Sequence, residues 1–495
     1  MKRALWLYSL GIIASILLYG SAFAACFGTS PNLTAASASR GDVADCVAAS
    51  TYGDTIRIPA CAPGNCTWTS GITITRDIKI IGNGIDVTVL TNGFANNGVE
   101  EAFFKFVPDS TARVRLSTLN GAGTFEVAGI TFTANTRMTN KFGVWIENYD
   151  LPAIRKVKIH DNKYINIHRA TQVKGYSHGV FYSNMLVDTN GSYPQGAGRA
   201  SFENDRYSVG FGRGWYLEDN TFTFSGVDAI IAGAANDGGG YVARYNTVTG
   251  TLYGGSTYFE THGNQLSYIY GPQITEVYGN EITATGVGKA TSVRGGKNIY
   301  LNNVMADGWI SIWEEYSDLA TSDTNPIGRC PENRGVSKQT CTDSCICQKV
   351  HDSYFINNRT STSGTVKNAS ILFDFWHRAN NIVNNPPELV ENIEFFNYVA
   401  SGFNGTAGVG CGTLANRPAT CTTGVGYWAT DQSCTDLTGM VGVNPSTPIT
   451  GTLYKCTSGN TWTTYFRPYT YPHPLRTGIS TPISAPQGIR AIPPQ

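Results

Sequence analysis

Four stretches of this chain repeat one pattern: WYLEDNTFTF (215–224), YVARYNTVTG (241–250), ITEVYGNEITAT (274–285) and KNIYLNNVMAD (297–307). Each is a run with strand propensity, an asparagine, and a second alternating run. The asparagines are Asn220, Asn246, Asn280 and Asn303, at spacings of 26, 34 and 23 residues. A unit of this length cannot bury its apolar face alone, so it must stack on its neighbours. The pattern therefore predicts a solenoid. Looser copies place further asparagines at Asn162, Asn184 and Asn358.

The alternation inside the repeats indicates that the coils are β-strands. Tyr216, Glu218 and Asn220 are expected on one side of such a strand, and Trp215, Leu217 and Asp219 on the other, which is a period of two rather than 3.6. Stacked coils lie ~4.8 Å apart, so equivalent asparagine side chains can hydrogen-bond to one another along the axis. We therefore expect an asparagine ladder that turns one corner of every coil.

At this point the sequence resembles the pectate-lyase-like family of right-handed parallel β-helices, over roughly Ala35–Tyr398. The most specific segment is RGGKNIYLNN (Arg294–Asn303), which looks like a recurrent coil of bacterial secreted β-helix proteins. The resemblance implies an all-β fold, a right-handed parallel β-helix whose open first coil is covered by a short helix. Ser37–Ser50 fits that helix, because Val43 and Cys46 lie on one helical face.

The ends of the chain differ from the repeats. Lys2 and Arg3, the apolar run Ala4–Leu18 and the small residues before Ala25 have the pattern of a secretory signal peptide. We therefore expect secretion rather than a retained membrane anchor. The expected organisation is a signal peptide at 1–24, an N-terminal cap at 25–52, a β-helix at 53–400 with an insertion at 321–348, a Cys-rich C-terminal element at 401–477 that covers the last coil, and a disordered tail at 478–495.

The cysteines support export to an oxidising compartment. All 12 follow the signal peptide, in locally even sets. Cys61 and Cys66 flank a turn-forming Ala-Pro-Gly-Asn and are expected to pair with each other. Lipidation of Cys26 would leave an odd number of thiols, which favours a freely secreted protein over a lipoprotein. The four cysteines of the insertion, Cys330, Cys341, Cys345 and Cys347, lack paired metal-ligand spacing, so two disulfides are expected there rather than zinc.

Charge and motifs exclude several function classes. The chain has 36 basic and 36 acidic residues, which argues against a nucleic-acid partner and against a polybasic membrane surface in the mature form. It contains no phosphate-binding loop, zinc-protease helix, serine-hydrolase elbow or EF-hand loop. The sequence does not indicate the oligomeric state.

Counting from the asparagines brings three polar residues together. Glu260 follows Asn246 by 14 residues and Arg294 follows Asn280 by 14, which would make them equivalent positions on adjacent coils. His262 is two residues beyond Glu260 and shares its side of the strand. Glu260, His262 and Arg294 are therefore the candidate catalytic residues. Counting backward instead pairs Asp237 with Arg294 and Asp228 with His262, so the exact partners stay open.

Aromatic and acidic residues near this cluster are the candidate contacts to substrate. A glycan stacks on aromatic rings and hydrogen-bonds to carboxylates. The aspartates that bind calcium in pectate lyases are not recognisable here, so the cofactor is unknown and no metal ligand is assigned, although calcium is chemically compatible. The candidate substrate-binding residues are Asp228, Asp237, Tyr258, Trp309, Trp313 and Tyr316.

Two classes of function follow from this reasoning. The first is a secreted lyase that cleaves an acidic polysaccharide by β-elimination, in which His262 is the base and Arg294 neutralises the sugar carboxylate or is itself the base. The second is a non-catalytic glycan-binding or cell-surface β-helix, in which Glu260 and Arg294 form only a surface ion pair. Hydrolase or epimerase chemistry is a further alternative, with Asp228, Asp237 and Glu260 as loose candidates.

Overall fold

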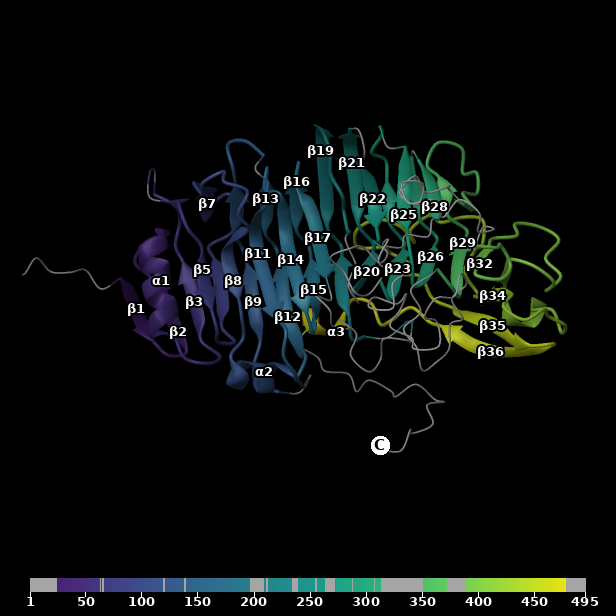
Figure 1. The fold of residues 1–495 in the computed structure, drawn as a ribbon, viewed down its shortest axis with the longest axis horizontal. Coiled ribbons are helices and arrows are strands. Elements are labelled where there is room, and N and C mark those ends of the chain that lie inside the picture. Colours follow the sequence, from purple (N-terminus) through teal and green to yellow (C-terminus); the bar gives the residue numbers. More distant parts are fainter. Residues whose placement is uncertain are drawn as a thin grey trace, which may run out of the picture.

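The computed structural model describes residues 25–62, 64, 66–118, 121–137, 139–195, 209–210, 212–233, 239–253, 256–262, 272–286, 288–306, 308–312, 350–371 and 389–477. Within them the chain winds into parallel β-sheets that run the length of an elongated molecule (Figure 1). Most coils add one short strand to each sheet, and these strands pair in parallel with the equivalent strands of the next coil. The predicted all-β, parallel β-helix is therefore confirmed.

Three sheets, here named A, B and C, form the sides of the β-helix. Sheet A has 13 strands in the order β1(Cys26–Thr29), β2(Asn32–Ala35), β3(Thr55–Ile58), β6(Lys79–Gly82), β9(Phe125–Ala128), β12(Ile154–His160), β15(Ser177–Tyr182), β18(Trp215–Glu218), β20(Gly240–Arg244), β23(Ile274–Tyr278), β26(Lys297–Leu301), β29(Ser353–Ile356) and β32(Phe395–Asn397). Sheet B has 10 strands: β4(Thr67–Trp68), β7(Val89–Asn92), β10(Thr131–Thr133), β13(Lys163–Ile165), β16(Met185–Val187), β19(Thr221–Val227), β21(Thr247–Leu252), β24(Glu281–Ile282), β27(Val304–Met305) and β30(Arg359–Thr360).

Sheet C consists of a five-stranded and a four-stranded part. The two parts are joined by single bridges from Ser192 to Ala232 and from Ala232 to Phe259. Its strands are β5(Ile72–Ile74), β8(Glu101–Phe106), β11(Lys141–Asn148), β14(Arg169–Gly175) and β17(Asn190–Gln195), then β22(Thr257–Glu260), β25(Lys289–Val293), β28(Trp309–Ile312) and β31(Ala369–Ile371).

The predicted asparagine ladder lies at the corner between sheets A and B. Each asparagine before the last donates from Nδ2 to the Oδ1 of the next asparagine at 2.8–3.2 Å. The backbone N–H of the same donating asparagine also bonds to that Oδ1, at 3.0–3.2 Å. Every member is buried, so these bonds satisfy polar groups that water cannot reach. The ladder consists of Asn162, Asn184, Asn220, Asn246, Asn280, Asn303 and Asn358.

The residue before each ladder asparagine makes the corner. All seven have a φ between 50° and 65°, which is the left-handed region that most side chains avoid. Tyr245 is the costliest of them, because a bulky residue rarely adopts this conformation, and its hydroxyl is held by the N–H of Ile449 at 3.0 Å. The corner residues are Asp161, Ser183, Asp219, Tyr245, Gly279, Asn302 and Asn357.

The N-terminal end is closed by the predicted helix and by an antiparallel pair that was not predicted. α1(Arg40–Ala49) begins at Ser39, whose side chain accepts the N–H of Asp42, and it buries Val43 and Cys46. The strands β1 and β2 form a hairpin, and a disulfide joins Cys26 to Cys46. This bond occupies the sulfur that a lipid anchor on Cys26 would need. A second helix, α2(Ser110–Leu116), begins at the capping residue Asp109 after β8.

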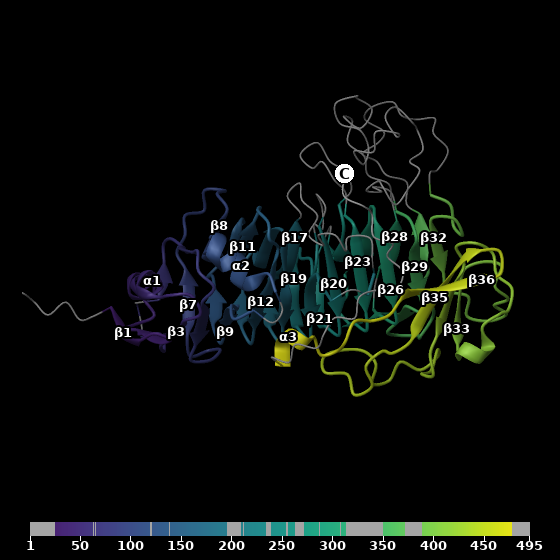
Figure 2. The ribbon, with the colours of Figure 1, turned by 90° about the horizontal axis from the view of Figure 1, so that it is seen from below.

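The C-terminal element does more than cover the last coil. It forms a four-stranded sheet, then runs back along the outside of sheet A to α3(Pro474–Thr477), which contacts β12 and β15 (Figures 1 and 2). Apolar residues on the outer face of sheet A, such as Tyr216, Ile299 and Tyr354, form one cluster with Trp428 and Phe466 of this element. The strands are β33(Val409–Gly412), β34(Gly426–Ala429), β35(Thr452–Ser458) and β36(Thr461–Phe466), with a short 3-10 helix at Leu414–Asn416.

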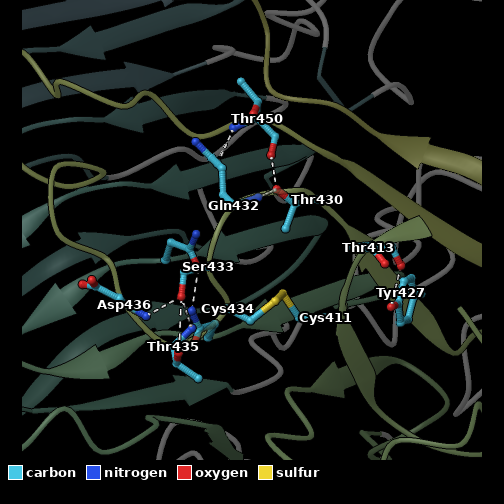
Figure 3. The surroundings of a disulfide bond; sticks show 12 residues. Cys411, Thr413, Tyr427, Thr430, Gln432, Ser433, Cys434, Thr435, Asp436 and Thr450 are labelled. Carbon is cyan, nitrogen blue, oxygen red and sulfur yellow. Dashed lines mark hydrogen bonds between the residues drawn. A yellow bond between two sulfur atoms is a disulfide. The ribbon is translucent and has the colours of Figure 1, made fainter. Parts of the chain in front are cut away.

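Disulfides staple this element together. Cys411 bonds to Cys434, beside a turn held by the side chains of Thr430, Gln432 and Ser433 (Figure 3). Cys421 bonds to Cys456. The predicted bond between Cys61 and Cys66 is also present, and no described cysteine is free. The segments predicted to be a signal peptide, a four-cysteine insertion and a C-terminal tail lie outside the described residues.

Candidate functional site

The three candidate catalytic residues meet on the outer face of sheet C. Glu260 ends β22, and Arg294 follows β25 on the next coil. Arg294 Nη2 donates to Glu260 Oε1 at 2.6 Å, and Arg294 Nη1 lies 3.1 Å from His262 Nδ1. His262 Nε2 lies 3.3 Å from the same Glu260 oxygen. The sequence therefore brought together three residues that are in mutual contact.

The register of this contact differs from the prediction. Glu260 pairs with Ser292, and Arg294 lies two residues further on, opposite His262. Glu260 and Arg294 are thus diagonal neighbours rather than equivalent positions. The diagonal is bridged because the guanidinium folds back along its own strand, where Arg294 Nε donates to Ser292 Oγ at 2.9 Å. Counting residues between asparagines failed here because the loops of the two coils differ in length.

The contacts of His262 indicate which ring nitrogen carries the proton. A guanidinium can only donate, so His262 Nδ1 accepts from Arg294, and the ring proton is on Nε2, facing Glu260. His262 is thus held between an acid and a cation. The only lone pair of the ring points at Arg294, so the residue that would take a proton is linked directly to the residue that would bind an anion.

Glu260 is ionised within this cluster. Burial by itself would raise the pKa of its carboxyl, but the hydrogen bond and the electrostatic interaction with His262, followed by the charge of Arg294, outweigh that effect and lower the pKa below its ordinary value. The side chains of Glu260 and Arg294 are both 11% exposed, and that of His262 is 23% exposed. The cluster is therefore partly dehydrated but open to a ligand from the outside.

Tyr258 was predicted to contact substrate, and this prediction is wrong. Its side chain is 0% exposed in the core, and its hydroxyl donates to the carbonyl of Ala284 at 2.6 Å. Simple alternation would place Tyr258 on the same side as Glu260. Instead, in this coil and in two others, two consecutive side chains at the sheet C position belong to the core. Such pairs are Phe103 and Phe104, Ile231 and Ala232, and Tyr258 and Phe259.

Of the other predicted substrate-binding residues, the structure describes Trp309 and Asp228. Trp309 lies on the outside at the start of β28, opposite Lys289, and is 48% exposed. Asp228 is exposed but outside the Glu260 cluster, because its carboxylate accepts the hydroxyl of Ser256 at 2.8 Å. Asp237, Trp313 and Tyr316 lie outside the described residues.

Two arginines on the same face were missed by the sequence analysis. Arg169 begins β14, and its guanidinium lies 4.1 Å from the centroid of the Tyr193 ring. Arg137 donates to Asn190 Oδ1 at 3.0 Å, on the strand next to Arg169. The repeats in this part of the chain are looser, so no asparagine spacing directed attention to them. The alternation in RATQVKG (169–175) could have placed Arg169 outside, but not Arg137, which follows a turn.

The described residues contain no group of three or more histidine, cysteine, aspartate or glutamate side chains arranged to hold a metal ion. In the same part of the chain no helix is long and apolar enough to cross a bilayer. The calcium question raised by the sequence is therefore left to the residues outside this set and to experiment.

Comparison with known proteins assigns no family. No family model matches the chain, and no curated protein matches it. Among solved structures, the chain is similar to ORF18 of Geobacillus virus E2, with 13% sequence identity and a TM-score of 0.27. That match covers 68% of this chain and 58% of the viral chain.

Proposed function

We propose that this protein is a secreted polysaccharide lyase that cleaves an acidic glycan by β-elimination at Glu260, His262 and Arg294. The observation that carries the proposal is the direct contact between the Arg294 guanidinium and the Nδ1 lone pair of His262. Export is supported by the four disulfides and by the signal-peptide pattern at 1–24. Membership of the pectate-lyase-like family is part of this proposal.

The chemistry follows from that contact. β-Elimination removes the proton from the carbon next to the sugar carboxylate, and it requires that carboxylate to be neutralised. When a substrate carboxylate binds Arg294, the guanidinium exchanges its bond to His262 for a charge-assisted bond to substrate. Nδ1 of His262 is then free to accept the proton, while the Nε2–H remains directed at Glu260. Binding of the acidic group and exposure of the base thus become one event.

Glu260 completes the set by stabilising the product of proton transfer. Once His262 is an imidazolium, its Nε2–H faces an ionised carboxylate whose pKa is already lowered in the folded protein. The electrons of the broken C–H bond form the new double bond, and the glycosidic oxygen leaves and is protonated by water. Arg294 as the base is the less favourable assignment, because a guanidinium stays protonated in proteins.

The test is formation of an unsaturated sugar. Purified protein is incubated with uronate-containing polysaccharides, with and without a calcium chelator, and ultraviolet absorbance of the new double bond is followed. His262→Ala should lower turnover by about 10²-fold or more. The matched control is His160→Ala, since His160 contacts Glu126 at 2.9 Å on the outside of sheet A, far from this cluster. Equal activity of the two variants would remove His262 from the reaction.

A second function is favoured by one feature of the same cluster. The bond between Arg294 and Glu260 is short and already closed, as expected of a structural ion pair beside the exposed Trp309. In a non-catalytic glycan-binding protein these residues would only shape the surface. Saturable binding of a polysaccharide with no unsaturated product from any uronate substrate would support this alternative.

A further inference from the structure

The cations on the outer face of sheet C fall into two groups. Most are neutralised by a carboxylate within ion-pair distance. Arg137 and Arg169 belong to the other group, because neither makes an ion pair with any carboxylate of the described chain. The neutralised pairs are Lys105 with Glu147 at 3.1 Å, Lys141 with Glu101 at 2.7 Å, Lys174 with Glu100 at 3.2 Å and Arg294 with Glu260 at 2.6 Å.

Arg169 is held in place by aromatic rings instead of an acid. Its guanidinium carbon lies 4.1 Å from the centroid of Tyr193 and 5.4 Å from that of Phe142. One Nη atom donates to the side chain of Gln172, while Nε is buried and has no acceptor in the described chain. Stacking on rings fixes the plane of the guanidinium but leaves its charge uncompensated.

Arg137 also lacks an ion-pair partner and an acceptor for Nε in the described chain. It donates to Asn190 Oδ1 at 3.0 Å and to the main-chain oxygen of Asp228, and its Nε is also buried without an acceptor in this part of the chain. The carboxylate of Asp228 accepts the hydroxyl of Ser256 at 2.8 Å. It makes no ion pair with Arg137, although its charge raises the pKa of Arg137 against the larger lowering effect of burial. Because Arg169 is the register partner of Asn190, its backbone lies about one strand spacing from the asparagine to which Arg137 donates.

The neighbouring histidine reports the resulting positive potential. Burial, followed by the charges of Arg169 and Arg137, lowers the pKa of His168 to about 3. His168 Nδ1 accepts the N–H of Asn140 at 2.9 Å, so this ring is neutral and adds no charge of its own. The hydroxyl of Tyr193 has no hydrogen-bond partner among the described residues, and it adds a third donor beside the two guanidiniums.

We propose that Arg137, Arg169 and Tyr193 form a binding site for an acidic group, a carboxylate or a sulfate ester, on a glycan chain lying along the outside of sheet C. Tyr193, Gly233 and Glu260 lie on three successive coils, so Tyr193 and Glu260 are two strand spacings apart, or ~10 Å. A chain that reaches both places must carry acidic groups on at least two different sugar rings. The inference rests on the proposed function only in taking a glycan as the partner.

The test is binding measured by titration calorimetry in the intact mature protein. Three hexasaccharide probes are used: a hexagalacturonate, a sulfated galactan that lacks uronate, and the neutral galactan. Arg169→Gln and Arg137→Gln should each weaken binding of the acidic probe about tenfold. Tyr193→Phe should weaken it a few-fold and retains the ring if the arginine variants fold poorly. The acidic probe that responds identifies the group as carboxylate or sulfate.

The matched control is Arg417→Gln. Arg417 also lies on aromatic rings, 4.4 Å from the centroid of Tyr454 and 5.7 Å from that of Trp462, but in the C-terminal element. Its replacement should leave affinity unchanged. Equal weakening by Arg417→Gln, unchanged affinity in all three site variants, or no binding of either acidic probe to the unaltered protein would overturn the proposal.

This outcome is separate from that of the lyase proposal. Loss of binding in Arg169→Gln without any unsaturated product from the unaltered protein would keep the acidic-group site and reject the elimination chemistry. Turnover that depends on His262, together with normal hexasaccharide affinity in Arg169→Gln, Arg137→Gln and Tyr193→Phe, would keep the elimination chemistry and reject the acidic-group site. Circular dichroism of each variant establishes that it is folded.

Discussion

The outer faces of sheets A and C each carry a glutamate–arginine pair, and the two pairs differ in what covers them. On sheet A, Arg244 and Glu218 are 0% exposed beneath the C-terminal element. All five N–H donors of Arg244 are used, by Glu218, the Tyr278 hydroxyl and the carbonyls of Tyr469 and Thr470. On sheet C, Arg294 and Glu260 remain partly exposed. The same chemical pair is a clamp in one place and a candidate binding site in the other.

The clamp explains why the C-terminal segment returns along sheet A. Arg476 of α3 donates to Glu218 at 2.5 Å and to Asp219, whose carboxylate also accepts the Tyr471 hydroxyl at 2.8 Å. Burial lowers the pKa of nearby His473 to about 4, so it stays neutral there. Once covered, a charge pair has no access to ligand and serves only to hold two segments together.

Arg244→Met should have the largest effect. It leaves Glu218 buried without its main partner, which typically costs about 3–5 kcal/mol. The unfolding midpoint in denaturant should fall, and limited proteolysis should release the segment after β36. Arg57→Met is the control, because Arg57 is exposed on the same sheet and its loss should change stability by less than about 0.5 kcal/mol. Similar stability losses for both variants would mean that packing of the C-terminal element on sheet A does not depend on the Arg244–Glu218 pair.

Glu276→Gln should stabilise the protein at alkaline pH. Glu276 is buried under the same cover, accepts only the N–H of Gly210 at 2.6 Å, and has its pKa raised to about 7, mainly by burial. The unfolded chain loses this proton near pH 4.5 and the folded protein near pH 7, so stability falls as pH rises between those values. The variant should lack this decline and gain about 3 kcal/mol above pH 7. Denaturant titrations from pH 4 to 8 measure the difference, and parallel curves would contradict it.

Arg294→Ala should act on turnover rather than on the fold. If the open pair binds the substrate carboxylate, its loss removes neutralisation and lowers turnover about 10²-fold or more, which corresponds to about 3 kcal/mol. Turnover is measured by unsaturated-product formation on the substrate found for the unaltered protein. Near-normal activity in a variant with unchanged circular dichroism would place the active site elsewhere on the β-helix.

Arg294→Met tests the comparison most directly, because it repeats at the open site the substitution made in the clamp. Glu260 keeps His262 as a partner and can take up water, so the expected loss is about 1–2 kcal/mol. Denaturant unfolding of Arg294→Met and Arg244→Met under the same conditions gives the stability loss of each variant for comparison. A loss as large as that of Arg244→Met would show that the sheet C pair is also structural.

The sequence by itself determined the features that repeat. The ladder asparagines, the helix over Val43 and Cys46, the disulfide between Cys61 and Cys66 and the contact among Glu260, His262 and Arg294 were all predicted. These depend on local spacing, because an in-register parallel stack turns one recurring residue into a column. Before the corner, a period of two placed Trp215 and Leu217 inside and Tyr216 outside correctly. It failed at the left-handed corner residue Asp219, which contacts Arg476 on the outside together with Glu218.

Only the tertiary structure decided which outer faces stay open. Tyr258 is buried because it and Phe259 are consecutive core residues, and Glu260 pairs with Ser292 because loop lengths differ between coils. The clamp joins Glu218 to Arg476 across 258 residues, a contact that no local pattern encodes. Local periodicity sets the side of a strand to which a residue points. Whether that side meets solvent or another segment depends on where a distant part of the chain finds enough apolar surface and hydrogen-bond partners to settle.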